Sequence, residues 1–348
     1  MIEKKNAFDL LRILLAICVL ITHGILLGGY QLLDPLASLS KGQTDLGEFG
    51  VMGFFTLSGY LITASYLGAK NSFIFVAHRI LRIFPGFWVC LIVTALVLAP
   101  LLYLAGGGQL NHFQFGGPGG AFAYIRHNFW LRVGQWGISG VLDKAAYGGS
   151  INGSLWSLFP ELQCYGLTLI MGLFGLFGRN KSLLLLVTFA VLAFFAINFN
   201  FIKTYGPTVL ILSPALKLYS AYLSGTLMFV FRDQLTLDKK GTILLALFVL
   251  VLLKFGGYHL LSPLLIAFLL INIFGKFSCK LRFDVSYGLY IYSFPLQQLL
   301  FQVFRGSLNI YLYLAMSFLL AIIMGYLSLL FVERPFMNLK QKADRLLA

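Results

Sequence analysis

The sequence predicts an all-α, polytopic membrane protein of about ten transmembrane helices with both termini in the cytoplasm. Of its 348 residues 59% are hydrophobic, and only 11% are charged, against roughly 25% in a typical soluble domain. Because the surface of a soluble globule needs polar side chains, a chain this apolar is expected in a lipid bilayer. Apolar stretches also recur from end to end, which favours one membrane domain over residues 1–348 without an appended soluble domain.

Ten stretches are long and apolar enough to be interpreted as transmembrane helices, each of which needs about 20 mainly apolar residues. They comprise residues 8–29, 47–67, 83–105, 155–177, 183–201, 209–231, 241–256, 258–274, 286–304 and 311–331. The seventh and eighth are short and nearly touch, so a re-entrant hairpin is an alternative there. No small-residue cleavage site follows the first, and we therefore expect a retained helix rather than a signal peptide.

The distribution of basic residues gives these segments an orientation. With the N-terminus in the cytoplasm, the loops assigned to the inside hold more than twice as many Lys and Arg residues as the outside loops. This agrees with the positive-inside rule and with an even number of spans. The net charge of +14 is then a consequence of topology. The lipid bilayer is the expected partner, and nucleic-acid binding is not expected.

Residues 106–154 form a long stretch between two segments and are rich in Gly and aromatic residues. The stretch is too polar to span a membrane cleanly, and loops of this length usually carry function. We expect a functional extracytoplasmic loop with short interfacial helices. The four cysteines form neither a CxxC pair nor a disulfide framework, and no metal site is expected.

The first segment carries three polar residues, Asp9, Arg12 and His23. On a helix, Arg12 and His23 face the same direction about 16 Å apart along the axis, with Arg12 nearer the cytoplasm. Ionisable residues inside a membrane indicate function, and His23 suits a general base that takes a proton from a hydroxyl. The alternatives are a surface anchor for Arg12 and a satisfied polar side chain for His23.

Arg79 and Arg82 are expected at the cytoplasmic surface, just before the third segment, and their spacing puts both on one helical face. Two such arginines suit a phosphate-bearing ligand, while anchoring by the positive-inside rule is the alternative. Glu161, beside Pro160 in the fourth segment, needs a partner or a proton within a membrane. It is a candidate partner for His23, with a structural hydrogen bond as the alternative.

Further polar residues in the segments are candidates for substrate contacts. Ser58 lies in the Phe-Phe-Thr-Leu-Ser-Gly run, Trp156 in a Leu-Trp-Ser-Leu run, and Tyr287 and Tyr290 in the ninth segment. Asp9 joins them from the first segment. Ser58 and the two tyrosines have an alternative in packing, because Ser next to Gly allows helices to approach closely and tyrosine rings pack well in cores.

Together these motifs resemble acyltransferase family 3, the integral-membrane acyltransferases of bacterial surface carbohydrates, over almost the whole chain. The resemblance begins with Arg12 and with His23 after ten intervening residues. It continues through the Phe-Phe-x-Leu-Ser-Gly run, the Arg79 and Arg82 pair, the Trp156 segment and the tyrosine-rich ninth segment. It closes on Val-Glu-Arg-Pro-Phe at residues 332–336.

The resemblance implies transfer of an acyl group, usually acetyl from cytoplasmic acetyl-CoA, to a sugar hydroxyl. The acceptor would be a glycan of lipopolysaccharide, exopolysaccharide or peptidoglycan type, or a lipid-linked precursor. The protein would be multi-pass in the bacterial cytoplasmic (inner) membrane. His23 is implied as the catalytic residue with Arg12 as its companion, and Arg79 and Arg82, with Arg12, as contacts to the CoA phosphates. Glu161 joins the catalytic group as the candidate partner of His23.

One position departs from the family pattern. Many relatives place a His before the Phe-Pro of the ninth segment, where this chain has Ser293. Either that His is dispensable or acceptor handling differs here. Two alternative functions are kept: the same family with another donor group such as succinyl, and a transporter of a glycan or organic anion, whose buried charges would line a path. A homo-oligomer is left open.

Overall fold

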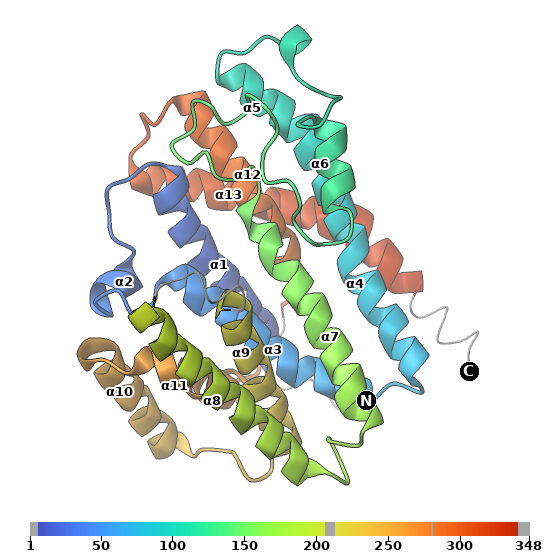
Figure 1. Cartoon of the computed structure of the whole chain (residues 1–348), viewed down its shortest axis with the longest axis vertical. Helices are drawn as coiled ribbons and strands as arrows, with labels where there is room; N and C mark the ends of the chain where they lie inside the picture. Colours follow the sequence, from blue (N-terminus) through green and yellow to red (C-terminus); the bar gives the residue numbers. More distant parts are fainter. Residues whose placement is uncertain (1–5, 206–212, 280, 340–348) are drawn as a thin grey trace. The chain divides into compact units, whose positions relative to one another are not determined.

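The computed structural model describes residues 6–205, 213–279 and 281–339, and this part of the chain is helical without a β-strand (Figure 1). The all-α prediction is confirmed, and helices occupy all ten predicted segments as far as they are described. The first residues of segment 209–231 lie outside the described residues. The helices are α1 (Phe8–Leu27), α3 (Leu46–Leu67), α4 (Ser72–Val93) running through η1 (Thr94–Leu98) into α5 (Ala99–Ala105), η3 (Gly153–Ser157) with α7 (Leu158–Leu173), α8 (Lys181–Tyr205), α9 (Ser213–Val230), α10 (Lys239–Phe255), α11 (Tyr258–Phe274), α12 (Ser286–Phe304) and α13 (Ile310–Ser328) with η5 (Leu329–Glu333).

Four helices in the described residues are long and apolar enough to cross a membrane, namely Phe8–Leu27, Leu46–Leu67, Ser72–Ala105 and Ile310–Leu339. Shorter apolar helices cover Lys181–Phe195 and Tyr258–Phe274. These helices agree with a membrane protein. The count of about ten spans stays a prediction. The cytoplasmic position of both termini concerns residues 1–5 and 340–348, which lie outside the described residues.

Two helix boundaries correct the sequence prediction. The third segment is predicted to begin at Ile83, after the paired arginines, but α4 begins at Ser72 and passes through Pro85. The side chain of Asn71 caps this start by accepting from the backbone N–H of Ile74 at 2.8 Å. The last segment is predicted to end at residue 331, but helical structure continues to Leu339. Charged residues at both places lower the hydropathy without ending the helix.

The chain divides into two compact units. The first unit comprises Met1–Leu15, Pro35–Val76 and Pro160–Leu281, and the second comprises Ala16–Asp34, Ala77–Phe159 and Arg282–Ala348. The helix α1 contributes its first part to the first unit and the remainder to the second. Arg12 therefore belongs to the first unit and His23 to the second, although both lie on this one helix.

Glycines set the helix packing of the first unit. The helix α3 packs against α9, and α9 also packs against α8 and α11. A Cβ atom at Gly59 would overlap the carbonyl oxygen of Tyr222, and a Cβ at Gly225 would overlap that of Thr56. Small residues that let two backbones approach in this way are typical of helix interfaces in membranes.

Replacing Gly225 with Ala is expected to destabilise the protein by about 1–3 kcal/mol, because the new methyl group meets backbone that cannot move aside. A lower melting temperature of the detergent-solubilised protein would show this. Gly166→Ala is the matched control, since Gly166 lies on α7 of the same unit and a methyl group there would meet no heavy atom within 4 Å. It is expected to leave the melting temperature unchanged or slightly raised. Equal losses in both variants would contradict the close packing.

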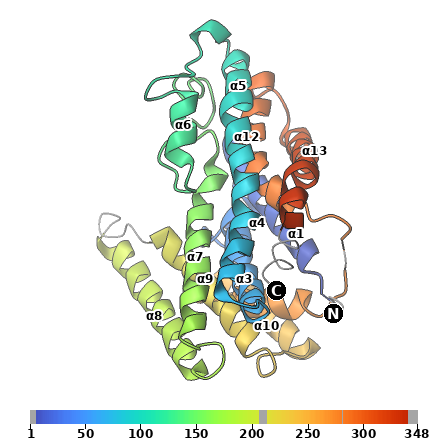
Figure 2. The same ribbon diagram turned by 90° about the vertical axis from the view of Figure 1, so that its right-hand side faces the viewer.

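The helix α12 is central to the second unit, where it packs against α13, α5, η1 and η3. Figure 2 shows α4 and α5 as one continuous rod. The stretch 106–154 contains two short helices, η2 (Leu110–His112) and α6 (Ala121–Asn128), which confirms the prediction of short helices there. The amide of Gln298 donates to the carbonyl oxygens of Tyr147 and Ser150 at 2.9 and 3.0 Å. The amide of Gln302 donates to that of Val141 at 3.0 Å, so α12 anchors the stretch.

Candidate functional site

Three parts of the second unit meet around the side chain of Phe294 on α12. The ring of His23, from α1, makes an edge contact with it at a centroid distance of 4.9 Å. The ring of Tyr147 lies 6.2 Å from it. A Cβ atom at Gly153 would lie 2.6 Å from the Phe294 ring, so the backbone there rests directly on the ring. His23 is thereby held against both α12 and the loop that leads into η3.

Three buried amide side chains lie within four residues of Phe294 on α12 or next to Gly153 in the chain. Gln297 and Gln298 are fully buried on α12, and Asn152 is 1% exposed. Gln297 donates through Nε2 to the carbonyl oxygen of Leu20 at 2.9 Å, and Asn152 donates through Nδ2 to that of Ile291 at 2.8 Å. In each amide the nitrogen is engaged by backbone, which fixes the amide plane and the direction of its oxygen.

Six buried side-chain atoms of these segments have no hydrogen-bond partner in the described part of the chain. They are His23 Nδ1 and the side-chain oxygens of Ser150, Asn152, Ser154, Gln297 and Gln298; we call these six residues the His23 cluster. An unpaired buried polar atom costs about 1–3 kcal/mol, and native proteins contain few of them. The amide oxygens can only accept hydrogen bonds. The acceptor oxygens of the cluster therefore suit a ligand rich in hydroxyl groups. The cluster also contains one nitrogen, His23 Nδ1, that is able to take a proton.

Two predicted substrate contacts lie near the His23 cluster in sequence and in the fold. The hydroxyls of Tyr290 and Ser157 share a buried hydrogen bond of 2.8 Å. Trp156 lies beside Ser157 in η3 and is half-buried. Ser293 is buried, and its hydroxyl donates to the carbonyl oxygen of Tyr290 at 3.2 Å. The hydroxyl of Ser293 is thus satisfied within α12, next to Phe294.

A second polar group gathers at the start of α12 in the same unit. Arg82 pairs with Glu333 at 3.1 Å and with Asp284 at 3.8 Å, and its guanidinium lies 5.8 Å from the centroid of the Tyr287 ring. The hydroxyl of Tyr287 donates to the carbonyl oxygen of Ile83 at 2.9 Å. Tyr287 therefore ties α12 to α4, and Arg82 joins α4 to both α12 and the end of the last helix.

These contacts add a structural role to Arg82. Arg79 lies one turn earlier on α4, so both arginines are inside this helix rather than before it as predicted. The carboxylates of Glu333 and Asp284 would compete with a phosphate for the Arg82 guanidinium, and its predicted contact with CoA stays a prediction. Glu333 lies in the π-turn η5, a distortion that is often found at functional positions.

Replacing Glu333 with Gln is expected to destabilise the protein by about 1–3 kcal/mol, because it removes the buried negative charge that pairs with Arg82 at 3.1 Å. Thermal unfolding of the solubilised protein measures this loss. Asp143→Asn, at an exposed carboxylate of the same unit, is the control and is expected to be neutral. An unchanged melting temperature in Glu333→Gln would show that the ion pair contributes nothing to the fold.

Other predicted site residues belong to the first unit. Arg12 pairs with Asp9 at 2.9 Å, and both side chains are about a quarter exposed. The carboxylate of Glu161 accepts a hydrogen bond from the hydroxyl of Tyr165 at 2.6 Å. This bond agrees with the alternative that Glu161 has a structural role. Glu161 and His23 belong to different units, and their pairing stays a prediction.

The first unit also holds a charged group that reasoning from the sequence missed. Lys217 on α9 is 5% exposed, donates to the carboxylate of Glu48, and lies 3.4 Å from Nδ1 of His259. Glu48 accepts in addition from Thr44 at 2.8 Å. A buried lysine needs such a carboxylate, because an unpaired buried charge is strongly destabilising. Glu48 escaped notice because it stands at the edge of segment 47–67. Ser58, a predicted substrate contact, is half-buried and lies ten residues later on the same helix.

Comparison with known proteins gives three findings. A family model described as an acyltransferase domain matches residues 5–332. The chain is 28% identical over 353 aligned positions to a protein named O-acetyl transferase from Shigella phage Sf6, with 97% of each chain covered. It is 29% identical over 206 positions to nodulation protein 10 from Rhizobium leguminosarum bv. viciae, covering 58% of this chain and 54% of the relative. No solved structure matches the chain significantly.

Proposed function

The chain belongs to acyltransferase family 3, and from that premise we propose that it is an integral-membrane O-acyltransferase. It moves an acyl group, most often acetyl, from acyl-CoA to a hydroxyl of a bacterial cell-surface glycan or its lipid-linked precursor. The relative named O-acetyl transferase supports acetyl as the group. The observation that carries the proposal is the His23 cluster, whose unpaired acceptor oxygens match the hydroxyl groups of a sugar.

In the proposed reaction His23 acts as the general base. Its Nδ1, which has no partner among the described residues, takes the proton of one acceptor hydroxyl. The hydroxyl oxygen forms a bond to the thioester carbonyl carbon, the carbon–sulfur bond breaks, and the CoA thiolate receives the proton from His23. Histidine suits both transfers because its ordinary pKa lies near neutrality. The oxygens of Asn152, Gln297 and Gln298 orient the sugar by accepting from its other hydroxyls.

On the donor side, we propose that the CoA phosphates contact Arg79 and Arg82 at the cytoplasmic face, with Arg12 as a further cation. Tyr287, beside Arg82, and Phe294, beside His23, are seven residues apart on α12, or about 10 Å along its axis. This separation supports a donor whose phosphates bind near Arg82 while its thioester extends to the depth of His23. Glu161 is proposed as the charge partner of His23. The proposed substrate contacts are Asp9, Ser58, Trp156, Tyr287 and Tyr290. The reaction needs no metal.

We propose a single acyltransferase domain in the bacterial inner membrane, crossing it about ten times with both termini in the cytoplasm. The four helices long and apolar enough to cross a membrane support this topology, as does the positive-inside distribution of Lys and Arg residues. Residues 106–154 would then lie on the extracytoplasmic side, held there by α12.

Mass spectrometry of the surface glycan from cells with and without the gene tests the proposed function. We expect acetyl esters on the glycan that disappear when the gene is deleted and do not return with a His23→Gln variant. A succinyl ester instead would keep the enzyme class and change the donor. A glycan whose modification is identical in both strains would contradict the proposal.

A further inference from the structure

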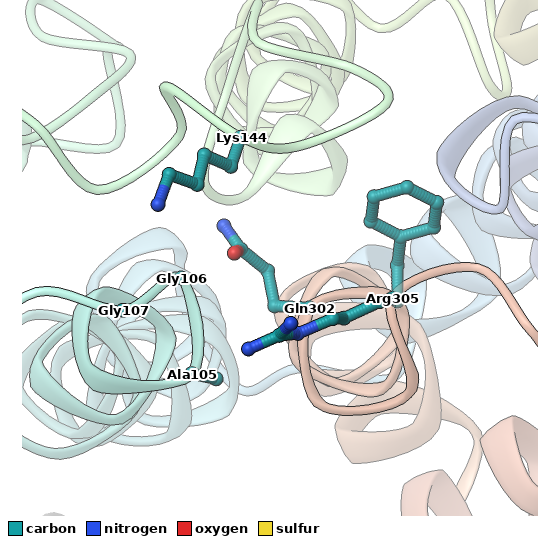
Figure 3. A pocket seen from close by; sticks show the side chains of 7 residues that line it. Ala105, Gly106, Gly107, Lys144, Gln302 and Arg305 are labelled. Atoms are coloured by element: carbon teal, nitrogen blue, oxygen red, sulfur yellow. The ribbon is translucent and has the colours of Figure 1, made fainter.

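A cavity of about 280 Å³ lies in the second unit at the end of α12 that is farther from Arg82. Its walls are the end of α5, the loop at Lys144 and the last turn of α12 with Gln302 and Arg305. Figure 3 shows the side chains of Lys144 and Arg305 reaching toward the same space, with the amide of Gln302 between them and the bare backbone of Gly106 and Gly107 opposite. Two cations thus converge on one cavity.

This cavity lacks a compensating carboxylate. Neither Lys144 nor Arg305 forms an ion pair with an Asp or Glu within the residues that the structure describes. The neighbouring Asp143 lines a different cavity. Both cations are exposed to solvent, and an anion between them would be attracted by both. The charge pattern is therefore complementary to an anionic ligand.

The backbone around the cavity leaves room for these polar side chains. Arg305 ends α12 with φ of 50°, in the left-handed region that residues other than glycine rarely adopt. Its backbone N–H donates to the carbonyl oxygen of Phe301, an arrangement that commonly ends a helix. A Cβ atom at Gly107 would lie 3.4 Å from Lys144 Nζ, and one at Gly106 would lie 2.9 Å from Gln302 Oε1. The glycines keep the wall of the cavity free where the polar side chains reach it.

We propose that this cavity binds the phosphate group of the lipid carrier on which the acceptor glycan is presented, an inference that rests on the proposed function. Lys144 and Arg305 supply charged N–H donors to phosphate oxygens. Gln298 and Gln302 are four residues apart on one face of α12, and Arg305 follows directly after the end of the helix. Phe294 and Gln302 are about 12 Å apart along that helix, so a carrier phosphate in the cavity leaves the attached sugars beside the His23 cluster.

Native mass spectrometry of the full-length protein in detergent tests this site without requiring turnover. The probes are a polyprenyl phosphate, phosphatidylglycerol and CoA, each titrated separately. Lys144→Gln and Arg305→Gln are each expected to weaken binding of the polyprenyl phosphate about tenfold or more, and Arg305→Lys to weaken it less. Arg132→Gln is the control, because Arg132 is an exposed cation of the same stretch that does not line the cavity; it should bind like the wild type.

Three outcomes would overturn the proposal. Unchanged polyprenyl phosphate binding in both glutamine variants would exclude the cavity. An equal loss of phosphatidylglycerol would identify it as a contact for bilayer lipid, and a loss of CoA would identify it as part of the donor site. If the wild type itself transfers no acyl group, the proposed function fails, whereas the binding result still shows whether the cavity takes the phosphate.

Discussion

Replacing His23 with Gln is expected to lower kcat for acyl transfer by about 10²–10⁴-fold, the usual contribution of a general base. Glutamine keeps a polar side chain of similar reach against Phe294 but cannot take a proton. The rate is measured with purified protein, labelled acetyl-CoA and a saturating acceptor. Binding of acetyl-CoA should be unchanged, because His23 contacts α12 about 10 Å along the helix from the Arg82 group.

The control for this substitution is His112→Gln. His112 is an exposed histidine of η2 in the same unit, and its replacement should leave both kcat and the melting temperature unchanged. Wild-type kcat in the His23→Gln variant would place the base elsewhere. A fall in kcat together with a large loss of thermal stability would instead point to a packing role for the ring against Phe294.

Replacing Gln297 with Leu is expected to raise the KM for the glycan acceptor by roughly 10–100-fold, while the KM for acyl-CoA stays within about twofold. Leucine fills the same volume but removes the unpaired oxygen that we assign to a sugar hydroxyl. It also removes the hydrogen bond to the carbonyl of Leu20. Because Leu20 is three residues before His23, part of the effect is expected in kcat. Initial rates over a matrix of donor and acceptor concentrations separate the two parameters.

Ser154→Ala is the matched comparison, since it deletes one unpaired hydroxyl of the His23 cluster and no anchoring bond. If that hydroxyl only sits buried without a partner, its removal should stabilise the protein and leave kinetics alone. If it binds the sugar, the KM for the acceptor should rise several-fold at unchanged melting temperature. Unchanged acceptor KM in both Gln297→Leu and Ser154→Ala would contradict the assignment of the His23 cluster to the acceptor.

The helices were predictable because their signal is local. A run of about 20 apolar residues is visible in the sequence itself, and a helix occupies every predicted segment in the described part of the chain. Boundaries were less predictable where charges are satisfied by distant partners. Arg82 lies within α4, and the carboxylates that pair with it, Glu333 and Asp284, are far away in sequence. Hydropathy alone treats Arg82 as the end of an apolar segment.

The site was predictable only in part. His23 and the arginines carry ionisable groups, which stand out in an apolar chain. Asn152, Gln297 and Gln298 are neutral, and the role that we propose for them rests on which half of each amide binds the backbone. These hydrogen bonds depend on the folded structure and cannot be inferred from the sequence. The available signal was the three glutamines in a mainly apolar and aromatic helix, where buried amides need hydrogen-bond partners.

Transfer of label from acetyl-CoA to a lipid-linked glycan by the purified protein in proteoliposomes tests the central claim most directly. We expect base-labile label in the glycan with the wild-type protein and a loss of about 10²-fold or more with His23→Gln. Movement of the glycan across the bilayer with no label attached to it would contradict acyl transfer and favour a transporter.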